Sequence, residues 1–393
     1  MTRITLLLLI IILSVLVRFA YINYAGAAIR IEPDSQAYYT TGNFFTGDFI
    51  HNYFNTNRTP GYNIITSLVI SASGYGHPPY LSGEFFRGSW YIIMLQTVVG
   101  VAGLFVLFDL LLAIGLPAGW SLAFTFFTGL NIYQFIWEHA FLSHALFITM
   151  VTIILRLFVA LLHKPTAVTG GIFTAVSVAA FLVRPAGIAI PFLLLPFVWL
   201  RHKTKKVLFL VLTLLCIYTL APLSHIIMNK SLYNFNGLSI NNDFALFGRI
   251  LHYHIPVDSA SSVRPLYDQV VSYRARGGNI SIPWYFFVYY NNEIYDQARE
   301  LRQFDRLVLQ KYWRPFAATM IGDIPRVFSD TNVSGVLHRS QAPGFAWLFF
   351  DSLARIFASI QKMSIVFLVL FPISLWLYAQ KAMGCTPYSK NIF

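Results

Sequence analysis

The chain has 393 residues, of which 56% are hydrophobic and only 11% are charged. A soluble domain carries about a quarter charged residues, so this composition excludes an ordinary soluble protein and indicates helices in a membrane. Lys and Arg number 28 against 16 Asp and Glu. No basic run belongs to a recognisable nucleic-acid-binding module, so anionic lipid is the better partner for this charge. The two cysteines, Cys216 and Cys385, are too few for a disulfide framework or a metal cluster.

Apolar windows long enough to cross a bilayer, about 20 residues each, recur along the chain. We interpret the first as a retained helix rather than a cleaved signal peptide, because no convincing cleavage site follows it. Basic residues of the short loops, above all those from Arg201 to Lys206, fall on one side, which predicts that both termini are cytoplasmic. The predicted fold class is all-α, a polytopic transmembrane helical bundle of about eight spans. The windows are centred on 4–24, 89–114, 118–136, 140–162, 166–183, 186–200, 207–228 and 362–379.

Two long polar segments are left on the opposite, external face of the membrane. They are a first loop at 25–88 and a segment at 229–343 that reads as a small exoplasmic domain. We therefore predict a transmembrane module at 1–228, which includes the first loop, and a separate C-terminal part at 344–393. The C-terminal part begins with an amphipathic stretch at 345–361 that is typical of an interfacial helix, and continues with the last span and a cytoplasmic tail.

One ion pair is expected inside the bundle. Asp109 and Arg156 lie at similar depth on two predicted spans that run in the same direction. Charges at such a depth are costly unless they are paired, so we expect these two side chains to meet and to serve the structure.

The first external loop carries acidic and basic side chains close to the membrane surface. Glu32 and Asp34 flank Pro33 soon after the first span. A carboxylate at this place is able to take a proton from an acceptor hydroxyl while a lipid-linked donor keeps its tail in the bilayer, which is the work of a general base. Arg58 is suited to a phosphate leaving group, because a guanidinium forks across two oxygens.

Several motifs in this order resemble the C-type superfamily of membrane glycosyltransferases. In the first loop these are the acidic pair with Asp-x-x-x-Tyr, Gly-Asp-Phe at 47–49 and Arg-Thr-Pro-Gly-Tyr at 58–62. Further along, Trp-Glu-His-Ala-Phe-Leu-Ser-His-Ala-Leu-Phe at 137–147 is similar to the family's second external turn and fourth helix, and Leu-Val-Arg-Pro-Ala-Gly at 182–187 resembles its later Arg-Pro turn. The similarity covers about the first 200 residues.

The resemblance implies an enzyme with its catalytic module at 1–228. Members of the family include protein O-mannosyltransferases and bacterial aminoarabinose and core-sugar transferases, which use polyprenyl-phosphate sugars. By this resemblance Asp34 is the catalytic base, and Arg58 and Arg184 receive the donor phosphate. The expected reaction moves a hexose or pentose from such a donor to a lipid, glycan or protein acceptor on the outer face of a bacterial inner membrane, within the cell envelope.

Four further residues are candidates for contact with the substrate or a metal ion: Glu32, Tyr38, Glu138 and His139. Glu32 coordinates a divalent cation, orients the acceptor or is merely solvated, and Tyr38 equally fits an aromatic belt at the interface. Glu138 and His139 fall at an external turn, which also tolerates polar residues that have no role. A divalent cation that bridges the donor phosphate to Glu32 or Asp34 is one alternative, so metal dependence stays open.

Two other functions fit the same residues. A transporter or flippase for a lipid-linked sugar would also line its path with basic residues, although the paired broken helices and repeated halves typical of transporters are not evident in the sequence. A catalytically inactive family member would keep the fold and bind lipid without turnover. The expected partners are the polyprenyl-phosphate donor, membrane lipids and the acceptor, and no nucleic acid.

Overall fold

The structure, a computed structural model, divides the chain into two compact units. It describes residues 2–25, 29–31, 35–40, 50, 54, 58–76, 78–252, 255, 264–276, 294–329, 349–350, 352–353 and 355–357. The transmembrane unit comprises Met1–Asn52, Pro60–Pro222 and Phe328–Phe393, and the second unit comprises Tyr53–Thr59 and Leu223–Val327. Regular structure in the described residues is helical, which confirms the predicted all-α class.

Five helices in the described part of the chain are long and apolar enough to cross a membrane, so the chain is a multi-span helical membrane protein. The apolar helix α9 (Ala167–Val183) is shorter than these five. The predicted window at 362–379 lies outside the described residues, so the total of about eight spans stays a prediction. The five are α1 (Arg3–Ala25), α5 (Gly83–Ala113), α8 (His144–His163), η1 with α10 (Pro185–Ile188 and Ala189–His202) and α11 (Lys205–Tyr233).

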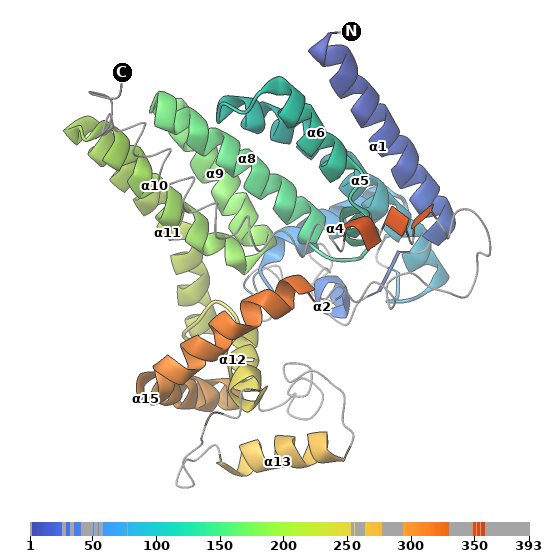
Figure 1. Ribbon diagram of the computed structural model, residues 1–393. Coiled ribbons are helices and arrows are strands. Elements are labelled where there is room, and N and C mark those ends of the chain that lie inside the picture. The colour runs from blue at the N-terminus through green and yellow to red at the C-terminus, as the bar shows by residue number, and fades with distance from the viewer. Residues whose placement is uncertain are drawn as a thin grey trace. The chain divides into compact units, whose positions relative to one another are not determined.

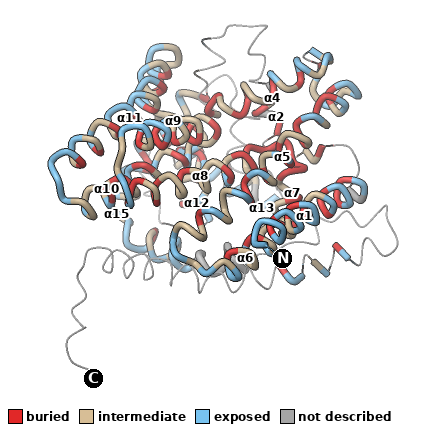
Figure 2. Tube along the Cα trace, turned by 90° about the horizontal axis from the view of Figure 1, so that it is seen from above, coloured by how far each residue is buried: buried red, intermediate tan, exposed pale blue. Residues whose placement is uncertain are grey.

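Helix α8 packs against α5 on one side and against α9 and α10 on the other (Figure 1). Small residues permit this close packing. A Cβ on Gly103 of α5 would lie 3.1 Å from Thr149 Oγ1 of α8. Buried residues lie where the helices face one another, and exposed residues line their outer surfaces (Figure 2). Large apolar side chains such as Val168 and Phe209, both 74% exposed, are suited to contact with lipid.

The prediction that Asp109 and Arg156 pair is confirmed, but the pair lies at the surface of the helices rather than inside the bundle, with the Asp109 side chain 58% exposed. Arg156 Nε donates a hydrogen bond to Asp109 Oδ2, which links α8 to α5. Each charge therefore has a compensating partner in a part of the chain that is otherwise apolar.

The prediction of one helix at 118–136 is wrong, while its crossing of the membrane stays a prediction. The segment forms two helices, α6 (Ala118–Gly129) and α7 (Ile132–Glu138). Asn131 has extended backbone angles and its side chain accepts a hydrogen bond from the backbone N–H two residues later, so it acts as the N-cap of α7.

Side chains of α1 replace backbone hydrogen bonds that are lost at this break. Ser14 Oγ donates to the carbonyl oxygen of Gly129 at 2.7 Å, and Arg18 Nη1 donates to the same oxygen at 2.9 Å. A break in a helix among apolar surroundings is tolerated when its polar backbone groups find partners in the protein, and α1 supplies them here.

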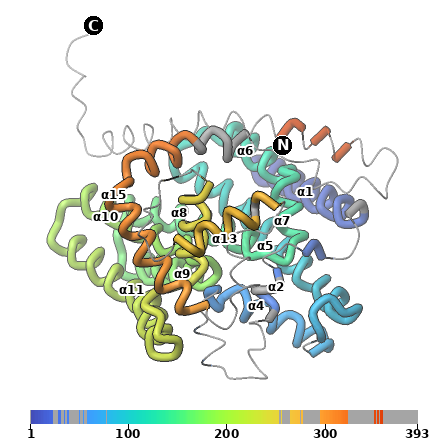
Figure 3. Tube along the Cα trace, turned by 90° about the horizontal axis from the view of Figure 1, so that it is seen from below, coloured from blue at the N-terminus to red at the C-terminus, as the bar shows by residue number. Residues whose placement is uncertain are grey.

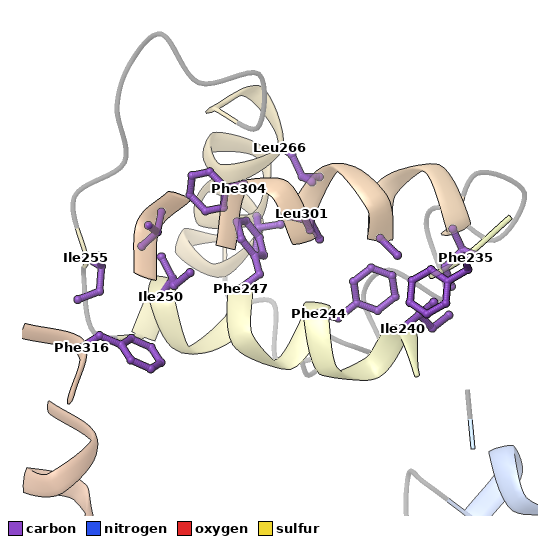
Figure 4. Close-up of a cluster of buried hydrophobic side chains, with 14 residues drawn as sticks. Phe235, Ile240, Phe244, Phe247, Ile250, Ile255, Leu266, Leu301, Phe304 and Phe316 are labelled. Atoms are coloured by element: carbon purple, nitrogen blue, oxygen red, sulfur yellow. The ribbon is translucent and has the colours of Figure 1, made fainter. Parts of the chain in front are cut away.

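The second unit has a hydrophobic core of its own, which Figure 4 shows. Its helices are α12 (Ile240–His252), α13 (Arg264–Ala275) and α15 (Ile294–Ser329). Phe247 of α12 is fully buried and packs edge-on against Phe304 of α15, with ring centroids 6.0 Å apart. The unit overlaps the predicted exoplasmic domain, whose place outside the membrane stays a prediction.

Only short pieces of the predicted interfacial helix at 345–361 belong to the described residues. These pieces, at 349–350, 352–353 and 355–357, are helical. Phe350 is buried and its ring contacts that of Tyr21 in α1, with centroids 5.4 Å apart. This contact ties the C-terminal part of the chain to the first helix.

Candidate functional site

The start of the loop that follows α1, the predicted first external loop, is fixed to the turn between α7 and α8. The backbone N–H of Arg30 donates to the carbonyl oxygen of His139 at 2.8 Å, and the N–H of Phe141 donates to the carbonyl oxygen of Arg30 at 3.0 Å. These bonds form an isolated parallel bridge between Arg30 and Ala140. Two segments about 110 residues apart in the sequence therefore lie side by side.

Tyr38 anchors the same loop a second time. It lies in the short helix α2 (Ser35–Thr40), next to α4 (Pro60–Ala72), as Figure 3 shows. Its hydroxyl is 3.0 Å from Ser143 Oγ, within hydrogen-bonding distance, and its ring packs edge-on against Tyr62 at a centroid distance of 4.9 Å. Tyr38 is only 5% exposed, so its ring lies in the interior of the transmembrane unit.

A glycine brings α4 against the end of α9. A Cβ on Gly61 would lie 2.6 Å from the carbonyl carbon of Leu182, so any larger residue would push the two backbones apart. Arg184 follows two residues later as the C-cap of α9, and its guanidinium carbon lies 5.9 Å from the centroid of the Phe147 ring in α8. Arg184 is thus placed where the ends of α4, α8 and α9 meet.

A buried ion pair joins α1 to the end of α7. Arg18 of α1 binds Glu138 at the end of α7 with two hydrogen bonds, from Nε to Oε2 at 2.8 Å and from Nη2 to Oε1 at 2.9 Å. Both side chains are almost fully buried. The remaining nitrogen, Nη1, reaches the carbonyl oxygen of Gly129, so Arg18 holds α6 and α7 at once. Such a fork-to-fork pair fixes direction as well as charge.

The amide of Gln96 in α5 extends the polar network to the turn between α7 and α8. Its Nε2 donates to the carbonyl oxygens of Glu138 at 2.8 Å and of Ala140 at 3.0 Å, and its Oε1 accepts a hydrogen bond from the Tyr62 hydroxyl at 3.3 Å. Gly100, one turn along α5, leaves room for the carboxylate, because a Cβ there would lie 2.1 Å from Glu138 Oε1. The network therefore joins α1, α4, α5 and α7.

Sequence reasoning missed Arg18, Ser14 and Gln96. Arg18 was detectable in the sequence, because it is a charged residue inside the apolar run of the first helix. Such a residue usually has a partner in the interior of the bundle. Glu138 was singled out as a candidate for substrate or metal contact. In the structure Arg18 engages both of its carboxylate oxygens, so this side chain holds the turn in place.

The remaining predicted site residues fall in different parts of the chain. Glu32 and Asp34 lie outside the described residues, and Arg58 groups with the second unit. His139 is buried, and its ring meets that of Tyr21 edge-on at a centroid distance of 5.9 Å. The arrangement of the base with the two arginines therefore stays a prediction.

Comparison with known proteins adds no family assignment, because no family model matches the chain and no curated protein matches it. Among the residues that the structure describes, no group of three or more His, Cys, Asp or Glu side chains is placed to hold a metal ion. What a divalent cation would contact in the first loop stays a prediction, since Glu32 and Asp34 are not described. Function is therefore argued from this chain's own residues.

Proposed function

We propose that the protein is a membrane glycosyltransferase that moves a sugar from a polyprenyl-phosphate donor to a lipid, glycan or protein acceptor at the outer face of a bacterial inner membrane. One observation carries the proposal. Four of the five segments that bear the resemblance have described residues that meet at one end of the transmembrane unit, through the contacts Arg30 to His139, Tyr38 to Ser143 and Gly61 to Leu182, and the fifth, at 47–49, lies outside the described residues. An accidental match of short motifs gives no reason for them to meet in space.

In the proposed reaction the oxygen of an acceptor hydroxyl attacks the anomeric carbon of the donor sugar. Asp34 accepts the proton of this hydroxyl at the same time. The bond from that carbon to the phosphate oxygen breaks, and the polyprenyl phosphate leaves with the electron pair, so the anomeric configuration inverts. Arg58 and Arg184 meet the charge that develops on the phosphate. Fixed positive groups in a partly dry site are more effective than water, because they need no reorganisation during the reaction.

The two anchors of the first loop support this role for Asp34. Arg30 precedes it by four residues and Tyr38 follows it by four, and both are held at the turn between α7 and α8. Positioning is a large part of catalysis by a general base, since the base must lie within hydrogen-bonding reach of the hydroxyl. The Arg18 and Glu138 pair holds the turn to which both anchors attach.

Transfer of radiolabelled sugar by membranes supplied with a panel of polyprenyl-phosphate sugars tests the proposal. Asp34→Asn keeps the shape of the side chain but removes the base, so we expect activity to fall on the order of 10²- to 10⁴-fold. Glu84→Gln is the matched control, because Glu84 is an exposed acid in the first turn of α5 on the same predicted face. Equal activity of wild type and Asp34→Asn would remove Asp34 from the mechanism.

The interruption between α6 and α7 favours a second candidate function, a transporter or flippase for the lipid-linked sugar. Transporters often bind substrate where a transmembrane helix is interrupted, and α6 and α7 are separated beside the buried pair of Arg18 and Glu138. Proteoliposomes that hold a fluorescent lipid-linked sugar separate the alternatives. A transporter moves the intact donor between leaflets, a transferase cleaves it only when acceptor is present, and an inactive family member binds it without either change.

A further inference from the structure

Helix α15 exposes large apolar side chains both before and after its kink at Tyr312. Leu307 is 64% exposed, Trp313 57% and Ile321 65%. On the same helix Phe304 and Val308 are buried in the core. The core therefore accounts for only part of the apolar surface of α15.

Basic residues accompany the exposed apolar ones. Arg306, Lys311 and Arg314 are exposed. The Arg314 guanidinium carbon lies 5.5 Å from the centroid of the Trp313 ring. The only acidic residue between positions 301 and 322 is Asp305, which is buried, so the exposed face has net positive charge. Basic and aromatic side chains mixed with aliphatic ones are typical of helices that lie in the membrane interface.

The backbone of α15 also suits a surface position rather than a membrane-spanning one. The helix is not among those apolar enough to cross a membrane. It bends at Tyr312, which has φ −122° and ψ 25°. Pro315 lacks the N–H that would bond to the carbonyl of Lys311 four residues before it, and its ring crowds that carbonyl. A carbonyl freed in this way finds hydrogen bonds among hydrated headgroups but not in hydrocarbon.

The membrane is within reach because α11 connects it to the second unit without interruption. This helix begins at Lys205 inside the transmembrane unit, contains one of the candidate spans, and ends at Tyr233 inside the second unit. Helix α12 then starts at Ile240, only a short connection later.

We propose that the exposed face of α15, defined by Arg306, Leu307, Lys311, Trp313, Arg314 and Ile321, docks on the anionic lipid surface of the membrane. The basic residues bind the headgroups, and Leu307, Trp313 and Ile321 enter the boundary between headgroups and acyl chains. The second unit is thereby held at the membrane by α11 at one point and by α15 at another. This proposal does not depend on the proposed sugar transfer.

Depth measurements on the full-length protein test it. A nitroxide is attached at Leu307→Cys, or at Ser272→Cys on α13 as the exposed control, with Cys216 and Cys385 changed to Ser. In nanodiscs that contain an anionic phospholipid we expect the label at 307 to collide preferentially with oxygen, as groups in lipid do, and the label at 272 to collide with a water-soluble nickel chelate. The preference at 307 weakens in purely zwitterionic nanodiscs or at high salt, where the electrostatic attraction is absent or screened.

A charge-reversed variant provides the second arm. Changing Arg306, Lys311 and Arg314 to Glu leaves the core side of α15 intact, so we expect the same thermal transition and the loss of the oxygen preference at 307. Equal access of the nickel chelate to positions 307 and 272 in anionic nanodiscs overturns the proposal. Low access of both oxygen and the nickel chelate to position 307 also overturns it, because a protein surface would then cover this face.

Discussion

At the scale of single residues, the pair of Arg18 and Glu138 illustrates what the sequence conceals. The prediction that Asp109 meets Arg156 succeeded because the helical spans fix the depth of each side chain. The partner of Arg18 lies at the end of the short helix α7, which the apolar pattern of the sequence does not predict. The depth of Arg18 in its helix is therefore not enough to predict this partner. Glu138 was recognised as a polar residue at a turn, yet its role depends on a partner 120 positions away.

Breaking this pair is expected to cost more than removing it. Arg18→Met or Glu138→Gln alone leaves an uncompensated partner or unpaired donors in the interior, a destabilisation of roughly 3–5 kcal/mol. The double variant Arg18→Met with Glu138→Gln removes both charges and should recover part of the loss. It should not recover all of it, because Arg18 also donates to the carbonyl oxygen of Gly129. Thermal unfolding of the four proteins in one detergent measures the coupling, and additive losses would contradict the assignment.

Asp305 makes the stability of the second unit depend on pH. Its carboxylate is 2% exposed, and neither oxygen has a hydrogen-bond partner among the described residues. Burial, followed by repulsion from Asp243, raises the pKa of Asp305 to about 8, although Arg302 acts in the opposite direction. In the unfolded chain an Asp has a pKa of about 3.9. The contribution of Asp305 to the free energy of unfolding of the second unit is therefore most favourable below pH 4, falls as pH rises towards 8, and changes little above that.

Asp305→Asn should remove this part of the pH dependence. We expect amide hydrogen exchange in α12 and α15 to be slower in the variant than in wild type at pH 8, and this advantage to shrink towards pH 5. Comparing the two proteins at each pH cancels the chemical effect of pH on exchange. Asp268→Asn is the matched control, because Asp268 is exposed and pairs with Arg264 at the surface. An identical pH profile for wild type and Asp305→Asn would refute the assignment.

At the scale of elements, apolar runs predict helices well and their interruptions poorly. The windows at 4–24, 89–114 and 140–162 correspond to α1, α5 and α8. The window at 118–136 is also largely apolar, but it contains Asn131, which favours an N-cap over the interior of a helix. Ser14 and Arg18 of α1 donate hydrogen bonds to the backbone carbonyl oxygen left without a helical partner at the break. Contacts from another helix cannot be predicted from the residue pattern of one segment.

The sequence indicated which segments could belong to a candidate site but not the contacts between them. Four of the five motif segments have described residues, and these lie close together in the structure. The atoms that join them are mostly backbone groups and small residues, such as Arg30 with Ala140 and Gly61 with Leu182. Neither a glycine nor a backbone hydrogen bond has a side chain whose chemistry would indicate the contact in the sequence. These contacts could therefore be found only in the structure.

At the scale of the whole molecule, α8 relates the candidate site to the orientation in the membrane. It begins at His144, beside the turn that holds the first loop, and ends at His163 next to Lys164. His202 at the end of α10 hydrogen-bonds to the carbonyl oxygen of Leu162, so the basic residues that follow both helices lie at one end of the transmembrane unit. With 20 residues α8 is about 30 Å long, which matches the hydrocarbon core.

The positive-inside rule then places the basic end in the cytoplasm and the candidate site outside. Cysteine labelling in intact cells tests this orientation on the Cys216→Ser, Cys385→Ser background. We expect a membrane-impermeant maleimide to label Glu84→Cys, at the start of α5, and to label Lys164→Cys only after the cells are opened. The reverse pattern would put the first loop in the cytoplasm. A donor whose sugar faces the exterior could then not reach Asp34, so this single outcome would remove the proposed reaction together with the predicted topology.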